Sequence, residues 1–239
     1  MKDKILLCVD TSGTTLTVSV MKNEAVLSSF NENTGLTHSC TLMPKIIEMI
    51  EKADINPEDI DYFVCANGPG SFTGLRIGVS AMKGLSNVLK KPMVEVSVLD
   101  GLKENIKDFD GIICPIIDAR RKEVYTALYY KNNKITKELN ISLDELFVIL
   151  KKEEKPVIFN GDGVISYKDY IKENIGDKCF FCNDEDMLQN AESIGKVALE
   201  KIKKGEITDY KNFSVSYLKP SQPEMEKENC KKGDCDKMN

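Results

Sequence analysis

The chain has 239 residues, of which 41% are hydrophobic and 30% are charged, and it contains no Trp. This balance predicts a folded protein with an aliphatic core, long enough for two small lobes, and excludes a disordered chain. The formal net charge is −5, and lysines alternate with acidic residues along the chain instead of forming a basic stripe, which argues against tight, unaided nucleic-acid binding.

The first half of the chain predicts three strands, a helix, a strand, a helix, a strand and a short helix. Pro44 is tolerated in the first turn of the first helix, and Lys90-Lys91-Pro92 ends the second. The expected strands are residues 4–9, 16–20, 25–30, 62–66 and 93–98. The expected helices cover residues 42–50, 75–89 and 97–105.

The second half repeats this order at an offset of about 107 residues, from Ile5 to Ile112. Ser142 and Glu145 form a predicted capping box at the start of its first helix. The expected strands are residues 112–117, 124–130, 134–139, 157–160 and 178–182, and the expected later helices are 167–174 and 191–204.

This doubled βββαβα order resembles the actin, sugar-kinase and heat-shock ATPase superfamily, in which two ribonuclease-H-like α/β lobes face each other across a cleft. We therefore expect a first, partner-binding lobe at 1–105 and a reduced second lobe at 106–218. Residues 219–239 are rich in charge and contain Pro220 and Pro223, so they predict a flexible tail.

Two loops carry candidate phosphate-binding chemistry. The turn at 10–13 offers hydroxyls, amides and a carboxylate for a metal ion, although the same residue types are common in turns. The loop at 67–76 leads from a strand into a helix, where free amides attract anions, but it lacks the ending of a P-loop. A tight connection capped by Ser71 or Thr73 is the alternative. The candidate residues are Asp10, Thr11, Ser12, Gly13, Gly68, Pro69, Gly70, Ser71, Thr73 and Arg76.

Three segments carry a more specific resemblance. They are Cys8-Val9-Asp10-Thr11-Ser12, the glycine-rich segment 68–78 and Asp118-Ala119-Arg120-Arg121-Lys122-Glu123-Val124-Tyr125. They resemble the signature segments of the TsaB family, whose members take part in forming threonylcarbamoyladenosine in tRNA. His38-Ser39 and Tyr217-Leu218 also fit this pattern, and the resemblance reaches to about residue 218.

The TsaB family is similar to TsaD, the subunit that transfers threonylcarbamoyl to N6 of adenosine 37 in tRNAs reading codons that begin with A. The resemblance implies a non-catalytic subunit that pairs with TsaD, or with itself, and works with a TsaE-type ATPase. It implies tRNA contact only through the complex and no tightly bound cofactor, with ATP or ADP at the complex interface. Whether this subunit binds nucleotide itself stays open.

The residues also argue against independent catalysis. Val98 and Leu102 stand where the TsaD pattern has its two metal-binding histidines, and His38 is the single histidine of the chain, so no two-histidine metal site exists. His38 and Cys40 are two residues apart on a predicted helix, a spacing that does not bring side chains together. The alternative function is a nucleotide-dependent kinase or transferase acting alone, which the small second lobe disfavours.

Cysteine usage and hydropathy place the protein in the cytoplasm. No apolar run approaches the roughly 20 residues of a membrane span, and the first residues do not form a secretory signal. Of eight cysteines, Cys8, Cys65 and Cys114 lie in apolar strands and predict reduced thiols. Cys179 and Cys182 with Cys230 and Cys235 leave a four-thiolate zinc site as an alternative.

The two long helices of the first half supply the expected partner interface. Each carries more apolar positions than one contact with a sheet requires, and methionines suit an adaptable surface. The candidate interface residues are Met43, Ile47, Ile50, Met82 and Leu85.

Overall fold

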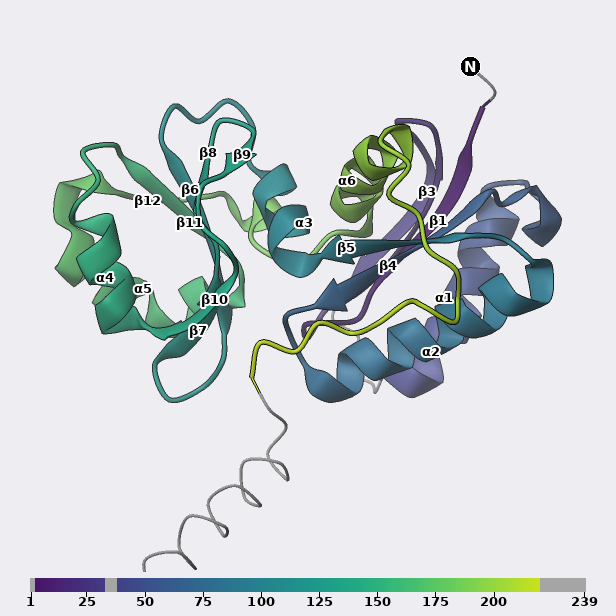
Figure 1. Ribbon diagram of the computed structural model, residues 1–239, viewed down its shortest axis with the longest axis horizontal. Helices are drawn as coiled ribbons and strands as arrows, with labels where there is room; N and C mark the ends of the chain where they lie inside the picture. The colour runs from purple at the N-terminus through teal and green to yellow at the C-terminus, as the bar shows by residue number, and fades with distance from the viewer. Residues whose placement is uncertain (1–2, 33–37, 220–239) are drawn as a thin grey trace, which may run out of the picture.

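The computed structural model describes residues 3–32 and 38–219 as two sheets with helices packed against them (Figure 1). The first half forms β1 (Ile5–Asp10), β2 (Leu16–Lys22), β3 (Ala25–Glu32), α1 (His38–Lys52), β4 (Tyr62–Gly68), α2 (Phe72–Leu89), β5 (Met93–Ser97) and α3 (Val98–Asn105). The second forms β6 (Ile112–Asp118), β7 (Glu123–Thr126), β8 (Tyr129–Tyr130), β9 (Asn133–Lys134), β10 (Leu139–Ser142), α4 (Leu143–Leu150), β11 (Val157–Asn160), α5 (Asp162–Ile175), β12 (Cys179–Phe181) and α6 (Ala191–Lys203). The first half has the predicted order of elements. The second half repeats it with additional short strands, and the single strand expected at 134–139 was wrong, because β9 ends at Lys134 and β10 begins at Leu139.

The first sheet has the strand order β3-β2-β1-β4-β5, with antiparallel pairing among β1, β2 and β3 and parallel pairing from β1 through β4 to β5. Both faces of its central strand are buried. Leu7 and Val9 pack in the cluster that includes α1 and α2, whereas Leu6 and Cys8 pack in the cluster that includes α3 and α6. The alternation of side chains along a strand therefore serves two helical layers at once.

The second sheet differs from the expectation at its first hairpin. A single strand was expected at 124–130, but β7 and β8 are separate strands that pair with different parts of β6. Pro115 lies between those two parts and has no N–H to donate, so the ladder breaks there. The side chain of Thr126 compensates by donating to the Pro115 carbonyl at 2.8 Å. The remaining order is β10-β7-β6-β11-β12.

The end of the described chain returns to the first sheet (Figure 1). Helix α6 packs with α3, and Ile194 and Ala198 are buried in the cluster with Leu6 and Cys8. The strap, residues 205–219, then crosses the same half of the molecule, where Phe213 is buried in the cluster of α1 and α2. Residues 191–218 of the predicted second lobe thus contribute to the packing of the first sheet.

The limits predicted for the lobes stay a prediction. The predicted flexible tail lies outside the described residues, except for Lys219. Within the described ranges, no helix has the length and apolarity that crossing a bilayer requires.

Candidate functional site

The two predicted phosphate-binding loops pack directly against one another. The amide of Ser71 donates to the Ser12 carbonyl at 2.7 Å, and the hydroxyl of Thr11 donates to the Gly74 carbonyl at 2.7 Å. A Cβ at Gly74 would overlap the Thr11 carbonyl, and one at Gly78 would overlap its hydroxyl. These glycines therefore allow the start of α2 to approach the turn after β1.

Few hydrogen-bond donors of these loops are left for a ligand. The amide of Ser12 donates to the Asp10 carboxylate at 2.7 Å. Ser71 caps α2 as predicted, because its hydroxyl accepts the Gly74 amide at 3.2 Å. Thr11 is buried as well. Since phosphate binding needs free amides and hydroxyls, this geometry favours the structural alternative, and phosphate binding stays a prediction.

Asp10 lies in a sealed polar cluster beneath the turn. Asp10 is 1% exposed, and burial raises the pKa of its carboxyl, while the hydrogen bond from the Ser12 amide and the charge of His38 oppose the rise. The ring Nε2 of His38 lies 2.9 Å from the Gly13 carbonyl, so Nε2 carries the hydrogen and donates. Gln189, which no sequence signal indicated, is buried against Gly13.

Several atoms of this cluster lack a hydrogen-bond partner within the described part of the chain. They include Asp10 Oδ2, Ser12 Oγ, His38 Nδ1 and Gln189 Nε2. Unpartnered polar atoms are costly when buried. The cluster therefore holds buried polar groups beside β1 that the described residues leave without partners.

The other predicted loop residues lie towards the strap. Gly68 has a φ of 123°, and a Cβ there would overlap the Ser216 carbonyl. Pro69 is buried, Gly70 is partly buried and Thr73 is exposed. The Arg76 guanidinium lies 3.8 Å from the centre of the Phe72 ring, and its Nε donates to the Tyr217 hydroxyl at 3.1 Å. Arg76 therefore fastens the strap to α2 and does not reach into the cluster around Asp10.

The predicted interface residues separate into two groups. Met43 is 38% exposed and Ile47 is 53% exposed, whereas Ile50 and Leu85 are partly buried. Met82 is 0% exposed and packs in the core, so its expected outward position was wrong: it lies on the stripe that α2 turns towards its own sheet. Two outward residues were missed, Val88 at 75% exposure and Gly84, whose Cβ position has nothing within 4 Å.

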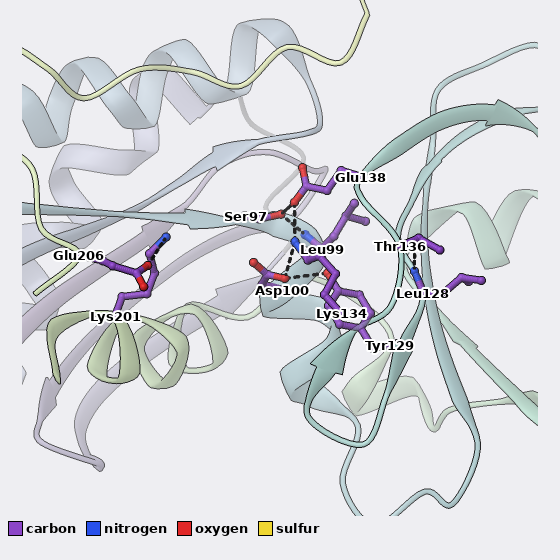
Figure 2. Close-up of polar contacts among 10 residues, drawn as sticks. All are labelled: Ser97, Leu99, Asp100, Leu128, Tyr129, Lys134, Thr136, Glu138, Lys201 and Glu206. Atoms are coloured by element: carbon purple, nitrogen blue, oxygen red, sulfur yellow. Dashed lines mark hydrogen bonds and ion pairs between the residues drawn. The ribbon is translucent and has the colours of Figure 1, made fainter. Parts of the chain in front are cut away.

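A network of charged and polar groups joins the two halves of the molecule (Figure 2). Asp100 of α3 accepts the Tyr129 hydroxyl at 2.7 Å and pairs with Lys134 at 2.9 Å. Lys134 also pairs with Glu138 at 3.0 Å, and Glu138 accepts the Ser97 hydroxyl at 2.5 Å. Burial acts to lower the pKa of Lys134, but its bonds to the two carboxylates outweigh this and raise it.

This network borders a cavity of about 870 Å³ between α3, α6 and the β8–β9 hairpin. Six lysines and six acidic residues line it. Because the two signs balance, the lining selects neither an anion nor a cation, and we assign it no ligand.

The residues considered for metal binding and thiol chemistry lie apart from the sites described above. Val98 and Leu102 are buried on α3, and the described residues contain no group of three potential ligands that could hold a metal ion. Burial raises the pKa of Cys114 to about 12 and those of Cys179 and Cys182 to about 11, as expected for inert thiols. Cys230 and Cys235 lie outside the described residues, so the zinc alternative stays untested.

The chain is similar in sequence to known proteins of tRNA modification. The family model of TsaD, tRNA N6-adenosine threonylcarbamoyltransferase, matches residues 31–225. The tRNA threonylcarbamoyladenosine biosynthesis protein TsaB of Bacillus subtilis is 37% identical over 179 residues, which cover 73% of this chain and 78% of that protein.

Solved structures agree with the predicted fold. The structure of YeaZ from Pseudomonas aeruginosa matches with a TM-score of 0.77 at 22% identity, covering 90% of this chain and all of that one. A ROK hexokinase from Thermus thermophilus matches with a TM-score of 0.50 at 8% identity, over 83% of this chain and 99% of the hexokinase. These matches confirm the actin- and sugar-kinase-like α/β fold.

Proposed function

Because the chain belongs to the TsaB family, which serves threonylcarbamoyladenosine formation in tRNA, we propose that it is a non-catalytic subunit that pairs with a TsaD-type catalytic subunit. The observation that carries this proposal is an apolar surface left over on α1 and α2 after both helices have packed on the first sheet. The closed packing of the two glycine-containing loops also supports a subunit without nucleotide chemistry of its own.

The docking surface consists of Met43, Ile47 and Ile50 on α1 and Gly84, Leu85 and Val88 on α2. Leu42, Ile46 and Val79 of the same helices are buried in the core of the first sheet. Ile50 and Leu85 are partly buried against that core and border the exposed residues of the docking surface. Exposed aliphatic side chains grouped on helices are typical of protein–protein contacts. Gly84 leaves open space beside them, which would let a helix of the partner approach closely.

The remaining partners follow from this assignment. The chain alone would pair with a second copy through the same surface, and a TsaE-type ATPase would join the heterodimer. ATP or ADP would bind at the joint interface, because the turn around Asp10 is buried. Contact with tRNA would arise only in the complex, since the chain carries a net charge of −5.

A matched pair of substitutions tests the docking surface. We expect Ile47→Glu to abolish pairing, because an unpaired charge buried at an interface costs on the order of several kcal/mol, or more than a thousandfold in affinity. Val148→Glu on α4 makes the same change at a residue of similar exposure, 58% against 53%, and should pair normally. Sedimentation with and without TsaD measures pairing, and circular dichroism confirms folding.

The proposal would be abandoned if Ile47→Glu and Val88→Glu both paired with wild-type affinity. The alternative, a kinase or transferase acting alone, predicts ATP turnover by the purified chain. We expect turnover and tRNA modification only after TsaD and TsaE are added. One tightly bound zinc or iron per chain, measured by elemental analysis, would also argue against the non-catalytic assignment.

A further inference from the structure

The turn between β6 and β7 presents three consecutive cations on a left-handed backbone. Arg120, Arg121 and Lys122, together called the basic turn, have φ angles of 70°, 57° and 60° and are all exposed. A Cβ is disfavoured in this conformation, which glycine adopts freely. Strained residues of this kind are concentrated at functional sites, where the surrounding structure holds them in place.

A layer of polar groups fixes the basic turn from beneath. The Asp118 carboxylate accepts the Arg120 amide at 2.8 Å and the Tyr167 hydroxyl at 3.0 Å. The Tyr167 hydroxyl in turn accepts the Lys122 amide at 3.3 Å. The Lys122 ammonium lies 4.4 Å from the centre of the Tyr170 ring. The backbone that carries the three cations is therefore fixed at Arg120 and Lys122 before any ligand arrives.

Nearby carboxylates compensate the charges of the basic turn only in part: Asp118 and Asp162 act on Arg120, and Glu123 acts on Arg121. The Arg120 side chain is 87% exposed, and its contact with Asp118 is long, at 3.4 Å. Glu123, the next residue along the chain, is already paired with Lys219 at 2.6 Å. In residues 3–32 and 38–219, no ion pair involves Arg121 or Lys122. The turn thus offers free cationic groups to an anion.

The strap places the basic turn next to the first turn of α2. Tyr217 stacks on Phe72 of α2 with ring centres 4.7 Å apart, and Lys219, two residues further on, reaches Glu123. The cations of the turn therefore lie near the start of α2, whereas Gly84, Leu85 and Val88 of the docking surface lie towards the other end of that helix. An anionic molecule held by a partner on that surface would have to extend along α2 by roughly 20 Å to reach them.

We propose that the basic turn binds phosphate groups of the tRNA backbone when the complex holds tRNA. This inference rests on the proposed function. Guanidinium groups bind phosphates through paired hydrogen bonds, and the turn lacks the apolar centre that a protein contact requires. The net charge of −5 makes the same contacts weak for the isolated chain.

The test uses the complex of this chain with TsaD and an unmodified tRNA whose anticodon reads a codon beginning with A. Fluorescence anisotropy across a salt series gives affinity and its salt dependence. We expect the Arg120→Ser, Arg121→Ser double variant to lower affinity about tenfold at ~0.15 M salt and to reduce the salt slope by about 1.5, the loss of two phosphate contacts. The control, Lys151→Ser with Lys152→Ser, removes two exposed charges from the same half of the chain and should change neither.

An unchanged affinity and slope in the double variant would overturn the inference, as would an equal loss in the control. The inference would also be overturned if the double variant lost binding to TsaD or TsaE while the salt dependence of tRNA affinity stayed constant. That result would mean that the turn binds an acidic protein surface. Sedimentation of the same samples separates this result from failure of the proposed function, in which the wild-type chain itself would not pair with TsaD.

Discussion

At the scale of single residues, Asp10 shows how burial sets a pH dependence. Its folded-state pKa is raised, so the folded protein holds this proton more tightly than the unfolded chain does. Burying the ionised carboxylate lowers the free energy of unfolding. This loss is absent at low pH and grows as pH rises above 3.8, the ordinary pKa of an aspartate carboxyl. An asparagine at position 10 keeps an oxygen that can accept the hydrogen bond from the Ser12 amide, and it carries no charge.

We accordingly expect Asp10→Asn to raise the free energy of unfolding at neutral pH by about 1 kcal/mol or more, because a neutral amide costs less to bury than a carboxylate. The gain should shrink towards pH 4, where the wild-type carboxyl is protonated. Urea denaturation at pH 4 and pH 7.5 measures both values. A variant that is less stable at both would show that the carboxylate has a partner that stabilises it.

The basic turn carries a second prediction at this scale. Arg121→Gly should stabilise the fold by about 1 kcal/mol, because glycine relieves the left-handed strain. Arg121→Ala is the control, since it removes the same charge and keeps the strain, and it should give no gain. Thermal denaturation compares the two. Equal midpoints of thermal unfolding for the two variants would mean that the backbone at Arg121 is not strained.

At the scale of elements, α2 contains glycines with opposite roles. Gly78 faces the Thr11 side chain with no room for a Cβ, whereas Gly84 faces open space. Gly84→Ala should therefore stabilise the helix by about 0.5–1 kcal/mol, and Gly78→Ala should destabilise the protein. Chemical denaturation of the two variants tests this contrast.

The same element allows a further measurement on Gly84. If a partner helix packs closely against it, Gly84→Leu should weaken pairing with TsaD in sedimentation while the chain remains folded. Pairing unchanged by the leucine would remove Gly84 from the docking surface and leave Ile47 and Val88 as its centre.

At the scale of the whole molecule, the network around Asp100 couples the two halves (Figure 2). Lys134→Met should lower the free energy of unfolding by about 1–2 kcal/mol, because Asp100 and Glu138 lose a shared, partly buried partner. Since the folded pKa of Lys134 is raised, its contribution is complete below the usual lysine pKa and is lost as pH rises through the raised value.

Lys203→Met is the control for this prediction. Lys203 pairs with Glu200 at 2.6 Å, but both side chains are about half exposed, so the change should have little effect. Denaturation at pH 7 and above pH 11 compares the two variants. An equal effect of both would show that the network around Asp100 adds nothing beyond a surface ion pair.

The amino-acid sequence by itself determined the order of elements, apart from the strands between β6 and α4, and the chemistry of the helix ends. The Ser71 cap and the capping box of Ser142 and Glu145 depend on residues three positions apart, so local pattern is sufficient to predict them. Likewise the motifs at 8–12, 68–78 and 118–125 were enough to indicate the family.

Only the tertiary structure decided which faces meet. Helical periodicity places Met82 and Val79 on one stripe, but it does not say whether the sheet or a partner covers that stripe, and the sheet covers it. Local sequence pattern also does not predict that Gln189 lies beside Gly13 or that β7 and β8 are separate strands opposite Pro115. It does not predict that α6 packs against the first sheet. These outcomes depend on contacts between residues far apart in the chain, which minimise exposed apolar surface for the molecule as a whole.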